Sequence, residues 1–337
     1  MMGLAGAKRS KCPRVLSPFE IEGQRFNEDN ITSQLLVAWY DFNDPSEMVS
    51  YESTWTVPPV DGERVGIISN KVKKNLVNNG ASSDHQKALG GYLLASSASL
   101  APYWHAPTDS SRGFARFDGV GNALFSSVVT PAVTGNFSSA TIDMNNFMIV
   151  IVCKRDLSVS TYMNLLNIYA KDPNQIMNLG YLGISKRLAF NSIDFNDAAD
   201  PSNGIVYDDA DDGEFHYHII NGYPSYLTIN TVAAMSSDGF WKVTDTYSQT
   251  SNTGVKTSTM EFDGIGHGAF VGLGCKKHPT IVDPHITQLF KGDIYELMIW
   301  KRDMDGGTSY DPNFDRNTHR DILHYLRRKY QYTRNTD

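Results

Sequence analysis

The chain has 337 residues, of which 41% are hydrophobic and 20% charged, so it holds enough apolar material for one large all-β domain or two ordinary domains. Its formal net charge of −7 argues against a general nucleic-acid-binding protein, because such proteins gather lysine and arginine on one face. In this chain, basic residues cluster only locally, at 8–14 and 327–329. The longest apolar run, 147–153, has the length of a strand and is too short for a membrane-spanning helix.

Residues 1–33 contain few large apolar side chains and cannot build a core of their own. We predict that they form an extended N-terminal arm that ties the domain to a neighbouring subunit. A disordered tail, or a strap across the same domain, is the alternative. The basic start is not followed by an apolar stretch, so it lacks the pattern of a signal peptide, and export by the general secretory route is not expected.

Residues 34–337 are predicted to form one all-β domain, because short apolar runs alternate with turn-forming residues, as in a sandwich or barrel. No repeat period is present. Strands are predicted at 35–42, 65–68, 114–117, 122–126, 147–153, 163–169, 178–184, 187–191, 215–220, 226–229, 239–243, 269–274 and 292–301. Long loops are predicted at 69–113, 194–213, 244–260 and 275–289, where turn-forming residues dominate.

A short amphipathic helix is predicted at 317–330. Ile322, Leu323, Leu326 and Tyr330 share one of its faces, and the basic residues in its last turn suit the negative end of the helix dipole.

The three cysteines, Cys12, Cys153 and Cys275, are widely spaced and match no metal-finger or redox motif. Cys153 and Cys275 fall in strand-like runs. We therefore predict buried free thiols rather than a disulfide, in keeping with assembly in a reducing cytoplasm.

Three segments, taken in this order along the chain, resemble a known family. They are LVAWYDFND at 36–44, ARFDG at 115–119 and GDIYELMIWKR at 292–302, and the last is followed by the predicted helix. Together they resemble the laminin-G-like, concanavalin-A-like jelly roll from about residue 35 to 332. The version closed by a helix with a Tyr-Leu-x-x-Lys-Tyr-like end is similar to modules in bacteriophage virion proteins.

The resemblance implies a β-sandwich in which the first and last core strands lie side by side. It implies that Asp118 and Gly119 form the corner between two strands, where glycine accepts a positive φ. The strand at 270–274 would precede the long loop to the final strand. The chain departs from the family in its long insertions at 70–112 and 194–214, which leave its ligand-facing loops unassigned.

Jelly rolls of this type include glucanases, whose paired carboxylates lie on alternate residues of one strand. The segment at 261–266 begins with Glu261 and Asp263 but lacks the second glutamate of that pattern. We interpret it as a polar strand edge and assign no catalytic residue.

The densest acidic run contains four candidate calcium ligands, Asp208, Asp209, Asp211 and Asp212. It lacks the spacing of an EF-hand, and a solvated acidic loop is the simpler interpretation, so calcium is the one cofactor left open. His216 and His218 would share one face of a strand, which is compatible with a metal, but no third ligand is near in sequence. The same caution about a metal applies to His278 and His285, which lie in a loop with Asp283. Residues 264–268 are interpreted as a turn rather than as a dinucleotide-binding loop.

Aromatic residues in turn-rich sequence are the candidates for contact with a glycan or a protein partner. They are Tyr92, Tyr103, Trp104, Tyr223 and Tyr226. Exposed aromatic side chains stack on sugars and anchor protein interfaces. The alternative is that they fix long loops onto the sandwich.

These features favour a non-enzymatic structural protein of a phage virion, either a capsid decoration or a tail-associated protein, with a lectin-like jelly roll that attaches to other virion proteins and contacts glycans weakly. One alternative is a receptor-binding tail-fibre lectin that recognises host surface polysaccharide. Another is a glycoside hydrolase or lyase with an atypical site. The expected partners are capsid or tail proteins, bound in part through residues 1–33, a host glycan, and further copies of the chain in an oligomer or lattice. No nucleic-acid or membrane partner is expected.

Overall fold

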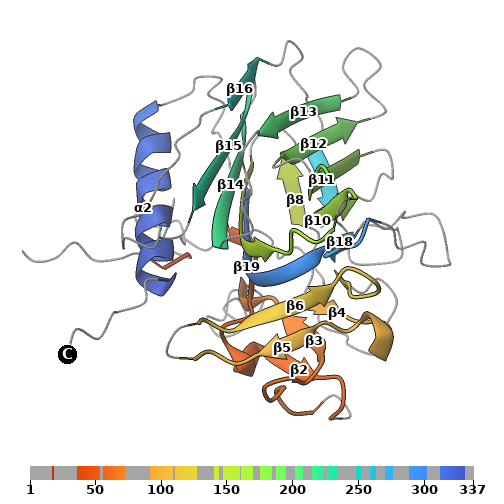
Figure 1. Ribbon diagram of the computed structural model, residues 1–337. Helices are drawn as coiled ribbons and strands as arrows, with labels where there is room; N and C mark the ends of the chain where they lie inside the picture. Colours follow the sequence, from red (N-terminus) through yellow and green to blue (C-terminus); the bar gives the residue numbers. More distant parts are fainter. Residues whose placement is uncertain are drawn as a thin grey trace, which may run out of the picture.

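The computed structural model describes residues 17–18, 36–53, 56–72, 92–108, 111–126, 140–143, 147–159, 161–169, 175–183, 187–194, 202–207, 215–223, 226–233, 248–251, 259–262, 270–275, 288–301 and 312–330. Two large antiparallel sheets face each other, and one long helix lies outside them (Figure 1). The predicted all-β sandwich is therefore confirmed. Within the described residues, no helix is long and apolar enough to span a membrane.

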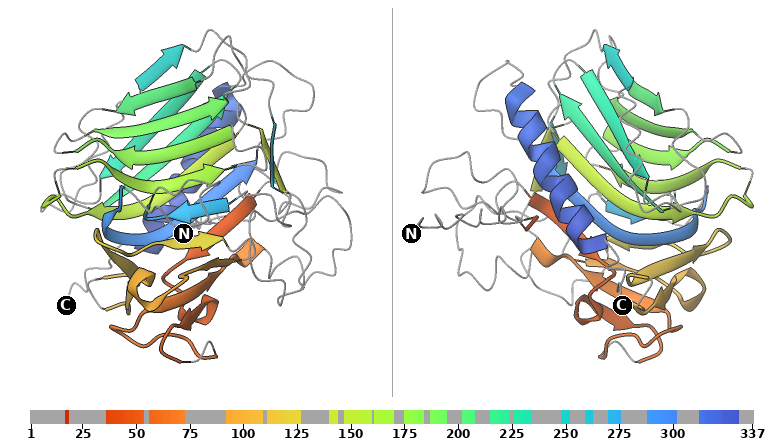
Figure 2. Two further views of the ribbon diagram at one scale, coloured as in Figure 1. Left: turned by 90° about the vertical axis from the view of Figure 1, so that its right-hand side faces the viewer. Right: turned by 60° about the vertical axis from the view of Figure 1, so that its left-hand side comes forward.

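The first sheet has eight strands. In spatial order they are β16 (Ser248–Ser251), β15 (Tyr226–Ala233), β14 (Phe215–Tyr223), β9 (Phe147–Arg155), β19 (Lys291–Lys301), β6 (Phe114–Asp118) and β5 (Tyr103–His105), while β1 (Leu36–Asp41) also pairs with β19. This sheet carries the outer helix, α2 (Pro312–Tyr330), as Figure 2 shows.

The second sheet has nine strands and packs against the inner face of the first. Their order is β13 (Ser202–Tyr207), β12 (Leu188–Asp194), β11 (Gln175–Tyr181), β10 (Met163–Tyr169), β18 (Phe270–Leu273), β7 (Leu124–Ser126), β4 (Tyr92–Leu94), β3 (Val65–Ser69) and β2 (Met48–Ser50). A separate pair joins β8 (Ala140–Asp143) to β17 (Thr259–Phe262), and two short 3-10 helices, η3 (Pro45–Glu47) and η4 (Ala98–Leu100), complete the described elements.

Strand β9 is apolar on both faces because both faces are covered. Ile149 and Ile151 belong to the core between the sheets, whereas Val150 and Val152 belong to a second cluster beneath α2. The helix contributes Ile322, Leu326 and Tyr330 to that second cluster. The prediction that 147–153 is a core strand is confirmed, and the outer helix explains why its sequence does not alternate.

Strand β1 pairs antiparallel with β19, with Leu36 opposite Trp300 and Asp41 opposite Glu296, so the first and last core strands lie side by side as expected. The corner at Asp118 is also confirmed. Gly119 has a φ of +74°, and the Asp118 carboxylate accepts hydrogen bonds from the next backbone N–H groups, those of Val120, Gly121 and Asn122.

Some predicted boundaries were wrong. The helix begins at Pro312 rather than at 317, in line with the preference of proline for a first helical turn. The predicted loop at 69–113 contains β4 and β5, that at 194–213 contains β13, and that at 244–260 contains β16 and the start of β17. These strands are three to six residues long and are defined by pairing with distant strands. The strand predicted at 239–243 lies outside the described residues.

Of the N-terminal arm, the structure describes Ser17 and Pro18. Pro18 is buried, and its carbonyl oxygen accepts a hydrogen bond from the Trp300 indole at 3.4 Å. At this point the arm touches its own domain, as in the strap alternative, and its contact with a neighbouring subunit stays a prediction. Cys153 and Cys275 are free and buried as predicted, while Cys12 lies outside the described residues.

Candidate binding surface

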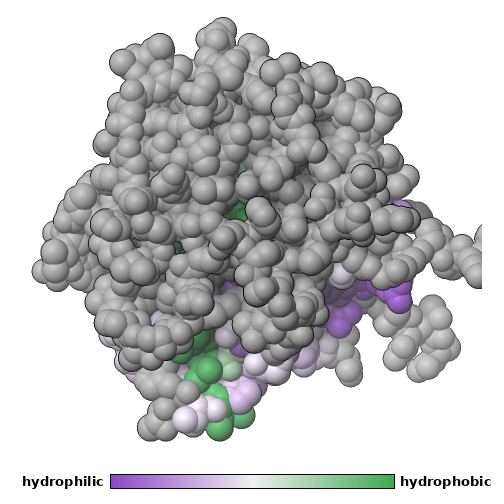
Figure 3. All heavy atoms as spheres, turned by 180° about the vertical axis from the view of Figure 1, so that it is seen from behind, coloured by the Kyte–Doolittle hydropathy of each residue, from purple (hydrophilic) through white to green (hydrophobic). Residues whose placement is uncertain are grey.

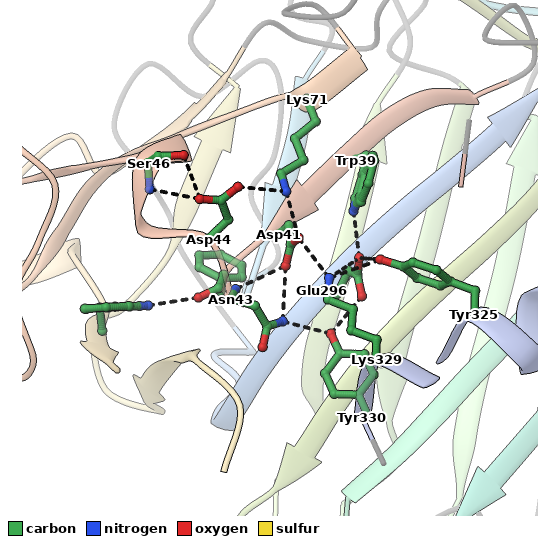
Figure 4. Close-up of polar contacts among 12 residues, drawn as sticks. Trp39, Asp41, Asn43, Asp44, Ser46, Lys71, Glu296, Tyr325, Lys329 and Tyr330 are labelled. Atoms are coloured by element: carbon green, nitrogen blue, oxygen red, sulfur yellow. Dashed lines mark hydrogen bonds and ion pairs between the residues drawn. The ribbon is translucent and has the colours of Figure 1, made fainter. Parts of the chain in front are cut away.

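Residues from 36–44 and 292–302 meet the end of α2 in a buried polar group, here called the anchor cluster (Figure 4). At its centre is Glu296 of β19, which is fully buried. Its Oε1 accepts hydrogen bonds from Trp39 Nε1 at 2.7 Å, the Tyr325 hydroxyl at 2.7 Å and Lys329 Nζ at 2.8 Å. Its Oε2 accepts one from the Tyr330 hydroxyl at 2.7 Å. Three side chains of α2 thus bond to one carboxylate of the sheet.

Asp41 forms the second half of the anchor cluster. Its Oδ2 lies 2.8 Å from the ammonium groups of both Lys71 and Lys329, and its Oδ1 accepts hydrogen bonds from Asn43. Lys71 also reaches Asp44 at 3.1 Å. Lys329 therefore bridges the carboxylates of Asp41 and Glu296 and links β1, β19 and α2.

The electrostatics of the cluster favour a fixed charge state. Burial alone would raise the pKa of Asp41, but the ammonium groups of Lys329 and Lys71 outweigh it and lower this pKa to about 2. Burial, together with the negative charge of Glu296, raises the pKa of Tyr325 and of Tyr330 well above its usual value, so both phenols stay protonated and donate.

A carboxylate pair that is buried away from solvent in this way is suited to stabilising the fold rather than to catalysis. Glycoside hydrolysis needs one carboxylate to reach the sugar and another to exchange a proton with it. Glu296 is fully buried and Asp41 is 4% exposed, and both are saturated with protein hydrogen bonds and ion pairs. The Tyr-Leu-x-x-Lys-Tyr end of the helix therefore supplies three of the groups that bind Glu296, while Leu326 fills the apolar cluster beneath α2.

The histidine pair lies inside the sandwich. The rings of His216 and His218 are stacked with centroids 5.7 Å apart, and His218 Nε2 is 2.6 Å from the Tyr181 hydroxyl of the opposite sheet. Cys153 Sγ is 3.4 Å from the same hydroxyl. Burial, and secondarily the neighbouring His216, lowers the pKa of His218 well below its usual value. Within the described residues, no group of three or more His, Cys, Asp or Glu side chains is arranged to hold a metal.

Several candidates from the sequence cannot be placed. The calcium candidates Asp208, Asp209, Asp211 and Asp212 lie outside the described residues, as do Asp263, His278, Asp283, His285 and the glycine-rich segment 264–268. Glu261 lies on β17, opposite Thr141 of β8. The interpretations of these residues stay predictions.

The predicted aromatic contacts have different surroundings. Trp104 on β5 is 4% exposed and donates its indole N–H to the Phe42 carbonyl at 2.9 Å, so it packs in the core, as in the alternative that these aromatic residues fix loops onto the sandwich. Tyr92 on β4 is half-buried. Tyr223 and Tyr226 are partners at the end of the β14–β15 hairpin, and their side chains lie outside the described part.

Tyr103 on β5 is exposed, with 37% of its surface accessible. Arg64 donates a hydrogen bond from Nη2 to the Tyr103 hydroxyl at 2.9 Å, and its guanidinium carbon lies 5.1 Å from the ring centre. The same guanidinium lies 3.7 Å from Glu52. Arg64 therefore holds the Tyr103 ring in place, and Glu52 in turn holds Arg64.

Cross-strand register places further charged side chains in line with Tyr103 on the outer face of the first sheet. Tyr103 is opposite Arg116 on β6, Arg116 is opposite Asp293 on β19, and Asp293 is opposite Lys154 on β9. Arg116 forms a two-pronged ion pair with Asp293, at 2.8 and 3.0 Å. Its side chain is 52% exposed, so this part of the outer face is open to solvent.

Two exposed apolar residues lie in the segment that leads to Arg64. Val57 is 50% exposed and Val60 is 63% exposed, in the loop that leads from β2 to Arg64. Figure 3 shows hydrophobic atoms at the surface at the lower end of the molecule, where Figure 1 places β2, β3 and β5. We define the Tyr103 surface as Val57, Val60, Arg64, Tyr103 and Arg116.

The backbone beneath the Tyr103 surface is already paired. Strand β5 pairs with β6 on one side, and on the other side Trp104 exchanges hydrogen bonds with Gly62 and Glu63 while Tyr103 bridges to Arg64. A partner therefore cannot add a strand here and must contact side chains.

A row of amides crosses the outer face of the second sheet. Asn167, Asn178 and Asn191 are direct partners on β10, β11 and β12, and Asn167 Nδ2 donates to Asn178 Oδ1. Among the described residues, the side-chain amide of Asn164 and the Oδ1 of Asn167 have no hydrogen-bond partner. Asn164 and Asn167 are fully buried, and Asn191 is partly exposed.

No family model and no curated protein matches the chain. Among solved structures, 248 chains match. One is the CBM40 of a Ruminococcus gnavus IT-sialidase bound to α2,3-sialyllactose, with 13% identity over 48% of this chain and 78% of that one and a TM-score of 0.33.

Two further matches are the LG1-3 region of the laminin α2 chain and the binding domain of botulinum neurotoxin serotype D. The first has 12% identity, covers 54% of this chain and 29% of that one, and has a TM-score of 0.33. The second has 7% identity, covers 87% and 52%, and has a TM-score of 0.40. At TM-scores below 0.5, these likenesses carry no argument about ligand, partner or activity.

Proposed function

We propose that this chain is a non-enzymatic attachment module of a bacteriophage virion, carried on the capsid or the tail, and that it docks onto a neighbouring virion protein through the Tyr103 surface. The observation that carries the proposal is an exposed tyrosine held rigid beside two arginines, Arg64 and Arg116. Tyrosine and arginine are the residues that most often dominate the energy of protein interfaces. Because the ring is already ordered, docking costs little side-chain entropy.

The bonding within the Tyr103 surface favours a protein over a glycan. Recognition of sugar hydroxyls needs free, directional donors and acceptors beside the aromatic ring. Here Arg64 is engaged by the Tyr103 hydroxyl and Glu52, and Arg116 is engaged by both oxygens of Asp293. What remains outward is the Tyr103 ring, together with the exposed side chains of Val57 and Val60 in the segment that leads to Arg64.

The virion location and the role of residues 1–33 in attachment rest on the family resemblance of the sequence. The non-enzymatic part of the proposal is supported by the state of Asp41 and Glu296, which are buried and bonded within the anchor cluster. An unoccupied carboxylate pair would be expected if the anchor cluster were catalytic.

A Tyr103→Ala chain should be incorporated into particles about tenfold less than the unmodified chain, because truncation of a central aromatic contact typically costs on the order of 1–2 kcal/mol or more. The measurement is quantitative mass spectrometry of purified particles from a host that supplies either version. The matched control is Val120→Ala, since Val120 is 81% exposed at the β6–β7 corner, away from the Tyr103 surface.

Equal incorporation of the Tyr103→Ala and unmodified chains would refute docking through this surface. Absence of the unmodified chain from purified particles would refute the virion location.

Glycan recognition is the second candidate function, and the amide row favours it. Asparagine amides suit sugar hydroxyls because they donate and accept, and Asn191, at the end of the row, is partly exposed. If this is correct, a glycan array should give a signal that Asn191→Ala weakens, with Ser99→Ala on the η4 turn as the control. An array without signal, in both calcium and chelator, would exclude it.

A further inference from the structure

The anchor cluster brings together three side chains whose chemistry goes beyond that of an ion pair. Figure 4 shows the amine of Lys329 between the carboxylates of Asp41 and Glu296. Lys329 Nζ lies 2.8 Å from Asp41 Oδ2 and 2.8 Å from Glu296 Oε1. The nitrogen therefore touches an oxygen bonded to the carboxyl carbon of Asp41, and at the same time it touches a second carboxylate that can accept a proton.

The fold holds these three groups in contact. Asp41 on β1 is directly opposite Glu296 on β19, so the sheet fixes their relative position. Lys329 is positioned by α2, whose Tyr325 and Tyr330 hydroxyls donate to the Glu296 carboxylate. Reacting groups held at contact distance behave as if their concentrations were many orders of magnitude higher than in solution. A reaction between the amine and the carboxyl group therefore needs little further ordering of the chain.

The surroundings also keep most water away from the amine and the two carboxylates. Asp41 is 4% exposed and Glu296 is fully buried. Lys329 Nζ lies 5.9, 5.5 and 5.6 Å from the ring centres of Trp39, Tyr325 and Tyr330. In bulk water an ammonium and a carboxylate do not condense, because hydration stabilises both ions and water reverses the reaction. The enclosure that keeps a substrate away from these groups thus favours their reaction with one another.

We infer that Lys329 and Asp41 condense into an intramolecular amide bond that joins α2 covalently to β1, with Glu296 as the proton carrier. The Lys329 ammonium first passes one proton to Asp41 Oδ2, which gives a neutral amine and a neutral acid without a change in total charge. The Nζ–Cγ bond then forms while Glu296 takes a second proton from the nitrogen. Glu296 returns this proton to Oδ2, the Cγ–Oδ2 bond breaks, and one molecule of water leaves.

The negative charge that develops on Asp41 Oδ1 during this reaction has donors already in place. The backbone N–H and the side-chain Nδ2 of Asn43 each donate to Oδ1 at 3.1 Å. Donors aimed at an oxygen that gains charge stabilise a tetrahedral intermediate. Lys71 acts in the opposite sense, because its ammonium, 2.8 Å from Oδ2, stabilises the ionised reactant. We therefore expect the bond to form slowly after folding, and chains that have not condensed keep the ion pair.

The bond would enclose almost the whole domain in one covalent ring. It joins residue 41, at the end of the first strand, to residue 329, near the end of the helix, so strands β2 to β19 lie between the joined residues. A cross-link over so long a segment restricts the unfolded chain and prevents α2 from separating from the sheet. The reaction involves only the anchor cluster, so it is independent of docking through the Tyr103 surface.

The test is mass spectrometry of the purified full chain, before and after a week at room temperature. The intact mass should fall about 18 Da below that of the sequence, the mass of the water lost. A tryptic digest should contain one branched peptide in which Lys329 is joined to Asp41. Lys329→Arg keeps the cation without a primary amine, and Glu296→Gln keeps an acceptor that cannot take up the proton. Neither variant should yield the branched peptide.

Two control variants should retain the branched peptide. Lys291→Arg changes a lysine that is paired with Asp156 outside the anchor cluster. Lys71→Met removes the other cation beside Asp41 and leaves Lys329 in place. Circular dichroism of every variant establishes that loss of the branched peptide is not loss of the fold, and the mass of the unmodified chain decides the question without any variant.

Three outcomes overturn the inference. The first is the full sequence mass in the unmodified chain after the week. The second is a mass deficit without a branched peptide, which would indicate a cyclic imide at an Asp-Gly step such as 61–62 or 118–119. The third is a branched peptide joined through Lys71, which would assign the reactive amine to the wrong lysine.

Discussion

Single side chains decide how the outer helix is held, and Lys329 is the clearest case. It lies 2.8 Å from carboxylate oxygens of both Asp41 and Glu296, two groups that are almost completely buried. Removing one partner from a buried charge cluster leaves the others uncompensated, which costs more than the interaction itself contributes. Lysine at this position therefore matters to stability far more than a surface lysine does.

Lys329→Met should lower the free energy of unfolding by about 3–5 kcal/mol, because Asp41 then keeps Lys71 as its one cationic partner among the described residues and Glu296 keeps only neutral donors. Urea unfolding followed by circular dichroism measures the change. Arg328→Met, the neighbouring substitution in the same helical turn, is the control and should stay within about 0.5 kcal/mol. Equal effects of the two substitutions would contradict the anchoring role of Lys329.

At the scale of elements, the apolar side of α2 complements its polar anchor. Ile322, Leu326 and Tyr330 face the sheet and cover Val150, Val152 and Trp300, which would otherwise leave the outer face of the first sheet exposed and apolar. The helix is thus part of the core rather than an appendage, since it completes the burial of the central strand β9.

Leu326→Ala should lower the free energy of unfolding by about 2–5 kcal/mol, the usual cost of a cavity at a fully buried leucine. Leu323→Ala is the matched control, because Leu323 is only partly buried against the same cluster and should cost less. Denaturant titration of both variants measures the difference. A larger loss for Leu323 than for Leu326 would show that the helix is rotated from the orientation described.

The sequence was sufficient to predict elements that carry strong hydrophobic signals. The strands at β9 and β19 and the helix face at Ile322 and Leu326 follow from apolar pattern alone, and the structure confirms them. Strands β4, β5 and β13 were missed because three to six residues cannot show a period, and their pairing is decided by distant strands.

The candidate site could be predicted only in part. Tyr103 and Trp104 are adjacent, so on a strand one must face outward and the other inward, but nothing local in the sequence fixes which. The structure exposes Tyr103 and buries Trp104. Glu296 and Lys329 are 33 residues apart, so their ion pair depends on how α2 folds back, which no motif spacing reveals.

At the scale of the whole molecule, stability depends on pH through groups whose pKa differs between the folded and unfolded chain. His218 has a folded pKa well below 6.5, so the unfolded chain binds the proton first and stability falls as pH drops below about 6.5. Asp41 has a folded pKa of about 2, so its contribution is complete above its ordinary value of 3.8 and is lost as pH falls from there toward 2.

The melting temperature should therefore decline in two stages as the solution is acidified, one beginning below about pH 6.5 and a steeper one below about pH 4. His218→Gln should remove the first stage, because glutamine retains a partner for the Tyr181 hydroxyl and does not titrate in this range. Differential scanning calorimetry from pH 8 to pH 3 measures both. An unchanged first stage in the variant would assign it to another group.

The anchor cluster also bears on how the chain is made. Its groups come from Trp39 and Asp41 near the beginning of the domain, Glu296 on its last strand, and Lys329 and Tyr330 at the end of the helix. During synthesis, the carboxylates of Asp41 and Glu296 lack some of their partners until the final turn of α2 has left the ribosome. A product cut short before that turn keeps nearly every strand yet retains unneutralised charge beside an uncovered apolar sheet, the kind of surface that cellular proteases and chaperones recognise. The last helical turn thus completes both the charge balance of the buried carboxylates and the apolar cover of the sheet.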